Sequence, residues 1–179
     1  MRTFIGSLLL LVGLVGSVSA ASYHLNADGT GDFATIAEAI AGAAPGDSIR
    51  LAAGLYLGAG NTQLDYGGKD IVIAGAGPEA TILDCMDSGV PVLRFENGET
   101  RAAVLRDLTL RNNYHFYEPT GVIIDSASPS LLNVHLEGFG GDHFYSGVGA
   151  IDCTNSSALL QDVEVRACYG RGGIRVSGA

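Results

Sequence analysis

One short pattern recurs along the sequence and limits the folds that this chain can adopt. An Asp or Asn accompanies alternating apolar residues in the stretches 47–51, 70–73, 105–111, 132–137 and 160–166. The markers of these stretches, Asp47, Asp70, Asp107, Asn133 and Asp162, lie 23, 37, 26 and 29 positions apart. Self-similarity at a period of about 20–50 residues is typical of solenoids, whose units bury their apolar residues against their neighbours.

A second apolar run occurs once in each of the later repeats. It begins at Gly121, Gly149 and Gly173, which are 28 and 24 positions apart. The interval of 37 residues also holds the apolar stretches 81–84 and 92–95, which predict inserted material there. Alternating strands also fit an antiparallel sandwich, but unrelated sandwich strands need not repeat one phrase. From Asp107 to Asp162, no Asn-Gly or Asp-Gly dipeptide marks a two-residue hairpin between successive repeats, so we predict an all-β parallel solenoid.

Residues 35–43 carry a clear helix signal. Thr35 and Glu38 have the spacing of a capping box. An apolar stripe at helical spacing follows, made of Ile36, Ala39, Ile40 and Ala43. We expect this helix to cover the N-terminal end of the solenoid, where an unpaired edge and a bare core would otherwise face water. We expect one inward stack to contain Ile49, Ile71, Leu108, Val134 and Val163.

The first twenty residues have the layout of a secretory signal peptide. Arg2 precedes an apolar or small stretch from position 4 to 15, and Val18 and Ala20 occupy the −3 and −1 positions of a cleavage site. The apolar stretch is shorter than the roughly 20 residues that span a bilayer. We predict export, cleavage after Ala20, and a mature domain of residues 21–179 that is secreted or at the cell surface and has no membrane span.

The charge of the chain excludes some partners. Ten Lys and Arg stand against 19 Asp and Glu, a formal net charge of −9 without any basic cluster. Nucleic-acid binding is therefore not expected, because phosphate contacts need Lys and Arg. Cys85, Cys153 and Cys168 are interpreted first as small buried apolar residues. A disulfide between Cys153 and Cys168 remains an open alternative.

Two phrases near the start carry a family resemblance. Residues 27–40, ADGTGDFATIAEAI, and residues 45–56, PGDSIRLAAGLY, resemble the opening of pectate-lyase-like right-handed parallel β-helix proteins. The later Gly-Gly-Ile and Leu-x-Asp-Val-x-Val phrases are similar to the repeats of secreted bacterial proteins with that fold. The resemblance extends over residues 24–179 and implies a right-handed parallel β-helix. It says less about activity, because function depends on sites rather than on folds.

The resemblance also implies several polysaccharide-directed activities, and the sequence lacks their clearest signatures. The Gln-Asp-Thr, Asp-Phe-Ile-Phe-Gly and Gly-Arg-Pro-Trp motifs of the methylesterases do not occur, and the chain has no Trp. A hydrolase would need clustered Asp, for which Asp125 and Asp152 on successive rungs are candidates, although Asp commonly caps turns. A lyase would need Ca²⁺ and a basic Arg. Ca²⁺ is thus implied by analogy alone, and we identify no metal site or other cofactor. The available arginines, which a solvated face would equally explain, are Arg106, Arg111, Arg166 and Arg175.

A repeated tripeptide is the most distinctive polar feature. His-Phe-Tyr occurs at positions 115–117 and 143–145, 28 positions apart like Gly121 and Gly149. Loops at equal positions in successive coils stack on one flank, where aromatic rings suit sugar faces and polar groups supply hydrogen bonds. The alternative is that Phe116 and Phe144 pack onto the coil and the loops are structural. The candidate ligand-binding residues are His115, Tyr117, Glu118, Asp142, His143 and Tyr145.

These observations predict a secreted β-helix domain that contacts extracellular polysaccharide or a cell surface and has no identifiable active site. The alternatives are part of a polysaccharide-active enzyme, namely a pectate lyase, polygalacturonase or pectin esterase, and a passive surface or stalk segment. The last phrase, Gly172 to Ala179, resembles the start of a further coil, and no helix or cap follows Val165. We therefore expect the coil to be incomplete at its C-terminus, because the last rung of a solenoid needs a cap.

Overall fold

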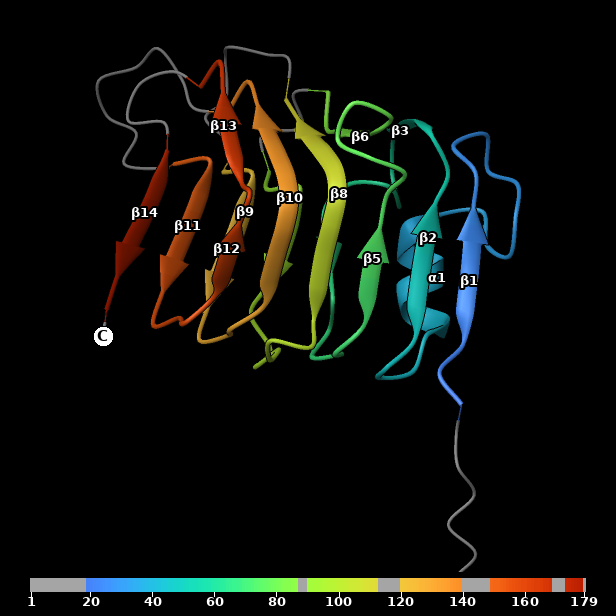
Figure 1. The fold of residues 1–179 in the computed structure, drawn as a ribbon, viewed down its shortest axis with the longest axis horizontal. Coiled ribbons are helices and arrows are strands. Elements are labelled where there is room, and N and C mark those ends of the chain that lie inside the picture. The colour runs from blue at the N-terminus through green and yellow to red at the C-terminus, as the bar shows by residue number, and fades with distance from the viewer. Residues whose placement is uncertain (1–18, 87–89, 113–119, 140–148, 169–172, 179) are drawn as a thin grey trace, which may run out of the picture.

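The computed structural model describes residues 19–86, 90–112, 120–139, 149–168 and 173–178, which wind into one coil of strands (Figure 1). One sheet has nine strands in the order β1-β2-β5-β8-β10-β12, with β13 paired to β10 and β3 and β6 paired to each other beside β8. The other sheet has five strands in the order β14-β11-β9-β7-β4. The nine strands are β1 (Ser22–Leu25), β2 (Ser48–Leu51), β3 (Gly54–Leu57), β5 (Val72–Ala74), β6 (Thr81–Asp84), β8 (Val104–Arg111), β10 (Ser130–Glu137), β12 (Leu159–Gln161) and β13 (Glu164–Arg166). The five strands are β4 (Leu64–Asp65), β7 (Leu93–Phe95), β9 (Val122–Asp125), β11 (Ile151–Thr154) and β14 (Ile174–Ser177).

Every named strand pair is parallel, and the chain alternates between the two sheets as it advances. In Figure 1 the facing strands of the nine-stranded sheet run upward while the coil advances from β1 on the right to β14 on the left. This sense of winding is right-handed, as expected for parallel crossover connections. The predicted right-handed parallel β-helix is confirmed, and the antiparallel sandwich is excluded.

The nine-stranded sheet is bent at the repeated Asp and Asn positions. Asp107, Asn133 and Asp162 have φ of 57°, 54° and 53°, the left-handed region that Asn and Asp tolerate better than most residues. The bend changes the inward spacing, so that Leu105 and Leu108 both face the core although they are three positions apart. It divides the sheet into a first arm, which precedes the bend, and a second arm, which follows it.

The stack that the sequence predicts is wrong in its register. Ile49 pairs with Ile73 rather than Ile71, and Ile73 continues to Leu105. Leu108 and Val134 do pair with each other, but they belong to the second arm. The cause is that the early markers Asp47 and Asp70 precede their strands, whereas the later markers lie within the bend. The stack of the first arm is therefore Tyr23, Ile49, Ile73, Leu105, Leu131 and Leu160.

The two apolar stretches between positions 70 and 107, which predicted inserted material, are themselves strands of the coil. Residues 81–84 form β6, and residues 93–95 form β7, so both stretches are regular rungs of the coil. The extra residues are the loop 75–80, which takes the place of the bend between β5 and β6. This loop folds onto the second arm, where the Thr109 hydroxyl donates to the carbonyl of Pro78 at 2.7 Å.

The predicted helix is confirmed as α1 (Ile36–Gly42), which lies behind β1 and β2 at the N-terminal end (Figure 1). The Thr35 hydroxyl caps it by accepting from the amide of Glu38 at 3.2 Å. Its buried residues, Ile36, Ala39 and Ile40, close the core beyond β4. At its other end, the ammonium of Lys69 donates to the carbonyls of residues 40, 41 and 43 at 2.7–2.9 Å, which satisfies carbonyls that a helix terminus leaves unpaired.

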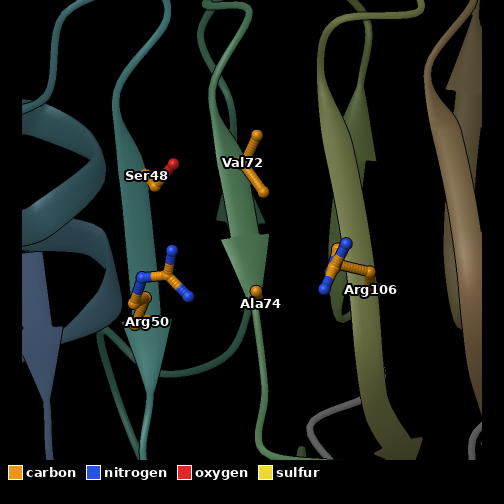
Figure 2. Close-up of a pocket in the computed structure, with 5 residues that line it drawn as sticks. All are labelled: Ser48, Arg50, Val72, Ala74 and Arg106. Atoms are coloured by element: carbon orange, nitrogen blue, oxygen red, sulfur yellow. The ribbon is translucent and has the colours of Figure 1, made fainter. Parts of the chain in front are cut away.

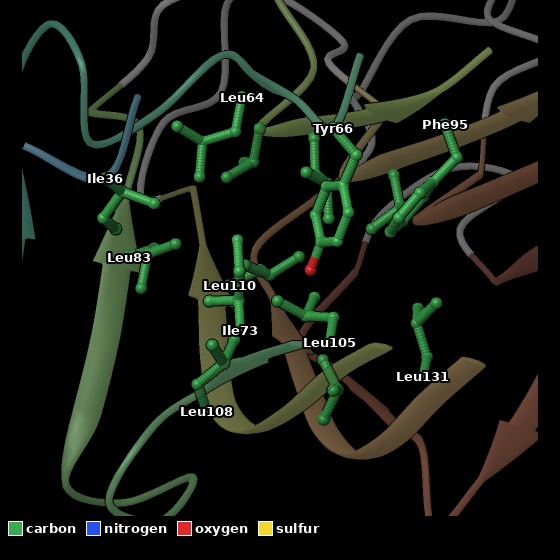
Figure 3. Close-up of a cluster of buried hydrophobic side chains, with 14 of the residues drawn as sticks. Ile36, Leu64, Tyr66, Ile73, Leu83, Phe95, Leu105, Leu108, Leu110 and Leu131 are labelled. Carbon is green, nitrogen blue, oxygen red and sulfur yellow. The ribbon is translucent and has the colours of Figure 1, made fainter. Parts of the chain in front are cut away.

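Between the two sheets lies one continuous apolar core, which Figure 3 shows around Tyr66. Tyr66 is fully buried and packs against Phe95, with ring centroids 4.5 Å apart. Its hydroxyl donates to the carbonyl of Val104 at 2.9 Å, so the polar end of the ring is satisfied. Among the described residues, no helix is long and apolar enough to cross a membrane.

Candidate functional site

The outward side chains of the five-stranded sheet form a column across the rungs that is charged at four of its five described positions. The register places Asp65 beside Arg94, Arg94 beside Ile123, Ile123 beside Asp152 and Asp152 beside Arg175. These positions point outward because the alternate residues of β4, β7, β9 and β11 are buried in the core. The parallel register therefore brings together side chains that lie 23–29 positions apart in the sequence.

Asp152 and Arg175 form the tightest pair in this column. Nε of Arg175 lies 3.0 Å from one carboxylate oxygen of Asp152, and an Nη lies 2.6 Å from the other. The carboxylate accepts both bonds, and this raises the pKa of Arg175. The Asp152 side chain is only 14% exposed, whereas Arg175 is 51% exposed. A fixed, mostly covered carboxylate beside a guanidinium can bind a polar ligand, and the carboxylate can accept a proton from one.

Asp125, which the sequence paired with Asp152, lies on the same face but in another register position. Its partner across the rung is Thr154, while Asp152 lies opposite Ile123. Asp125 is exposed and accepts a hydrogen bond from the Ser126 hydroxyl at 2.9 Å. The two carboxylates are thus diagonal neighbours rather than direct ones, and each has its own partner.

The six predicted ligand-binding residues lie outside the described residues, in the segments 113–119 and 140–148. The ends of both segments are described, and they adjoin each other. At the start, Arg111 pairs with Glu137 across β8 and β10. At the end, Val122 pairs with Ile151 across β9 and β11. The described residues that flank the two segments therefore lie at equal positions of successive coils.

A charged network covers the second arm of the nine-stranded sheet. His135 on β10 lies between two carboxylates, with Nδ1 3.5 Å from Glu79 and Nε2 3.6 Å from Glu164. Arg166 on β13 donates to Glu164 at 2.7 Å and to Glu79 at 3.1 Å, and lies 3.6 Å from Glu137. The bond from Arg166 lowers the pKa of Glu164. This network fastens the loop 75–80 to β13 across two intervening strands.

The other predicted arginines also have acidic partners. Arg111 binds Asp84 at 2.9 Å, and Arg106 binds Asp107 at 2.7 Å. Arg111 and Asp84 are neighbours across β8 and β6, and Arg106 and Asp107 are neighbours along the chain. Both ion pairs therefore contribute to the structure as well as to the charge of the surface. Cys85 is buried, and Cys153 and Cys168 are not joined, so the disulfide left open by the sequence is not formed. Burial raises the pKa of Cys153 and Cys168.

Sequence reasoning missed a depression on the first arm of the nine-stranded sheet (Figure 2). It has a volume of about 230 Å³ and is lined by Ser48, Arg50, Val72, Ala74 and Arg106. The signal that predicts it is the register, since Arg50 pairs with Ala74 and Ala74 with Arg106. The marker alignment placed Arg50 and Arg106 at unrelated positions of the repeat, so the sequence alone did not bring them together.

The analogy with Ca²⁺-dependent lyases finds no support in the geometry of these sites. Across the ranges that the structure describes, no three His, Cys, Asp or Glu side chains are placed to hold a metal ion. On the five-stranded sheet, Arg175 occupies both oxygens of Asp152. The donors present there fit an ion pair rather than a Ca²⁺ site, which needs six to eight oxygen ligands.

The parallel register of the two sheets and the sense of their winding define the chain as a right-handed parallel β-helix. No family model matches the chain, and no curated protein sequence matches it. Among solved structures, the chain is similar to a pectin methylesterase from carrot, with a TM-score of 0.41 and 17% sequence identity. The similarity covers 87% of this chain and 65% of the carrot protein, so this chain spans less than two thirds of that protein's length.

Proposed function

We propose that the chain is an exported β-helix domain that contacts extracellular polysaccharide. The contact surface consists of the outward face of the five-stranded sheet together with the segments 113–119 and 140–148. The observation that carries the proposal is the shared register at both ends of these two segments. It supports a stacked arrangement of the two His-Phe-Tyr sequences.

The backbone contacts at these ends support the same arrangement. The amide of Asn112 donates to the carbonyl of Glu137 at 2.9 Å, just before both segments begin. The amide of Val122 donates to the carbonyl of Ala150 at 3.0 Å, just after both segments end. Aromatic rings bind the apolar faces of sugars, and the imidazole and carboxylate groups bind their hydroxyls. The adjoining column of Asp and Arg side chains extends the surface with further hydrogen-bonding groups.

The export part of the proposal rests on residues 1–20, whose charge and apolar pattern fit a cleaved signal. A protein that leaves the cell meets polysaccharide at cell walls and surfaces. Expression of the full chain in a secreting host, followed by mass determination of the product, tests this part. Cleavage after Ala20 is expected, and retention of the intact chain inside the cell contradicts export.

Replacing Tyr117 and Tyr145 by alanine is expected to weaken polysaccharide binding by about tenfold or more, because each ring supplies stacking area at low entropic cost. Binding of the mature chain is measured on a glycan array and then by calorimetry with the best ligand. The control variant is Leu57→Ala, since Leu57 is an exposed apolar side chain on β3. Unchanged binding in the double variant contradicts the proposed surface, and absence of binding to any glycan favours a passive stalk.

A second candidate function is an enzyme that acts on polysaccharide at the same face. The pair of Asp152 and Arg175 favours it, because a mostly covered carboxylate beside a guanidinium suits proton transfer and charge stabilisation. This candidate predicts product formation, whereas the binding domain predicts none.

If the face is catalytic, Asp152→Asn is expected to lower the rate by at least about 100-fold, the usual contribution of a positioned acid or base. Release of reducing ends, unsaturated products and methanol from pectin and polygalacturonate are measured separately. Asp125→Asn serves as the matched control on the next rung. Activity that survives Asp152→Asn rules out this residue, and no activity in the unmodified chain leaves the binding function.

A further inference from the structure

The depression on the first arm lies between two arginines that the coil places two strands apart. Arg50 extends from β2 and Arg106 from β8, and Ala74 on β5 lies between them in register. Figure 2 shows both guanidinium groups inclined toward β5, above the small side chains of Val72 and Ala74. Neighbouring strands are about 4.8 Å apart, so two long side chains can reach one group held above Ala74.

We propose that this depression binds a tetrahedral oxyanion, a sulfate or phosphate group, between Arg50 and Arg106. The site lies on a different sheet from the proposed polysaccharide surface, and it stands independently of that proposal. No residue of the two His-Phe-Tyr sequences takes part in it.

The charge around the depression supports an anionic ligand. The outward column through Arg50 and Arg106 also contains His24, beside Arg50 on β1. In the described strands of this arm, the outward positions carry no Asp or Glu: they are Ser22, His24, Ser48, Arg50, Val72, Ala74, Val104, Arg106, Ser130, Leu132, Leu159 and Gln161. The chain has a net charge of −9, so this cationic surface is a local exception that attracts anions at short range.

Each arginine is held by its Nε and presents its other donors. Nε of Arg50 donates to the Ser22 hydroxyl at 3.0 Å, and Nε of Arg106 lies 2.7 Å from a carboxylate oxygen of Asp107. These contacts fix the direction of the two guanidinium groups, whose terminal amino groups carry the remaining donors. Asp107 neutralises part of the charge of Arg106, but it lies at the bend, beside the depression rather than in it.

The planar, forked arrangement of donors on the two guanidinium groups favours a tetrahedral anion over a carboxylate. A carboxylate presents its two oxygens along one edge, so when one arginine binds that edge with two hydrogen bonds, an arginine on the opposite side cannot do the same. A sulfate or phosphate group presents oxygen pairs in several directions, so two guanidinium groups on opposite sides can each bind one pair. The Ser48 hydroxyl at the rim of the depression supplies one further donor.

Binding of dextran sulfate to the mature chain tests this proposal at low salt, with polygalacturonate as the carboxylate polymer. Arg50→Gln combined with Arg106→Gln is expected to weaken dextran sulfate binding by about tenfold or more, because bonds to charged groups are the strong ones. Arg101→Gln combined with Arg166→Gln, at residues outside the depression, removes the same two charges and is expected to leave binding within about twofold. Arg50→Lys keeps the charge but loses the fork, and weakened binding is expected there too.

Titration with sodium sulfate tests whether the isolated ion binds without the polymer. Binding is expected to shift the amide resonance of Ala74 in NMR spectra. Tyr117→Ala with Tyr145→Ala is expected to keep sulfate binding, which separates this site from the proposed polysaccharide surface. Dextran sulfate binding that survives the variant of Arg50 and Arg106 overturns the proposal, as does an equal loss in the control variant of Arg101 and Arg166. Equal binding of polygalacturonate at the same arginines overturns the preference for a tetrahedral anion.

Discussion

Replacing Tyr66 by alanine is expected to lower the free energy of unfolding by about 3–5 kcal/mol, the usual cost of removing a buried ring. Tyr66 is fully buried, packs 4.5 Å from the ring of Phe95 and closes the core between the two sheets (Figure 3). The removed ring leaves a cavity that rigid parallel strands fill poorly. Urea unfolding followed by circular dichroism measures the change.

Tyr66→Phe separates the ring from its hydroxyl. It keeps the packing but removes the bond to the carbonyl of Val104, and a loss of about 1–3 kcal/mol is expected because that buried acceptor loses its partner. A loss in Tyr66→Phe as large as that in Tyr66→Ala contradicts the view that the ring carries most of the effect.

Burial also makes Tyr66 a source of alkaline instability. Desolvation raises its pKa well above the ordinary value of 10.0, and the charge of Glu99 adds to that rise. The unfolded chain therefore ionises this tyrosine first, so its contribution is fully present below about pH 10 and is lost as the pH rises toward the folded pKa. For one such group, the free energy of unfolding falls by up to about 1.4 kcal/mol per pH unit. Tyr66→Phe is expected to reduce the fall in stability above pH 10.

Replacing Gly138 by alanine is expected to lower the free energy of unfolding by about 2–5 kcal/mol, through left-handed strain and a steric overlap. Gly138 has φ of +75°, and a Cβ there meets the carbonyl oxygen of Asn112 on the neighbouring coil. The two backbones can approach so closely only without a side chain. Thermal and urea unfolding of the variant measure the effect.

Gly98→Ala is the matched control for this change. Gly98 has φ of +79°, nearly the same, but a Cβ there meets nothing within 4 Å. It is expected to cost only the strain of a left-handed residue, about 1–2 kcal/mol. Equal losses in the two variants show that the contact with Asn112 contributes nothing.

The sequence was sufficient to predict the coil and its cap, because both depend on local patterns. The recurrence of an Asp or Asn beside alternating apolar residues predicted parallel rungs, and such repeats bury their apolar residues only when stacked. The helix at α1 (Ile36–Gly42) followed from a capping signal at Thr35 and an apolar stripe at helical spacing.

The same repeats did not predict the register. Asp47 and Asp107 are both acidic residues beside alternating apolar positions, and the sequence does not distinguish them. In the fold, Asp47 precedes β2 and accepts bonds from the amides of residues 21 and 44. Asp107 lies within β8 at a left-handed bend. The two residues differ in backbone conformation, because the strand turns at Asp107 and does not turn at Asp47.

The sequence by itself determined the parallel coil, the capping helix and the acidic charge, since each follows from local pattern or composition. Only the tertiary structure decided which side chains meet. It paired Asp152 with Arg175 and placed Arg50 and Arg106 on either side of Ala74, because neighbours in a solenoid are set by the residues per turn. One loop of extra length, such as 75–80, shifts that count. Local sequence patterns do not specify the number of residues in each turn of the coil. Hydrogen bonding between successive rungs fixes that number.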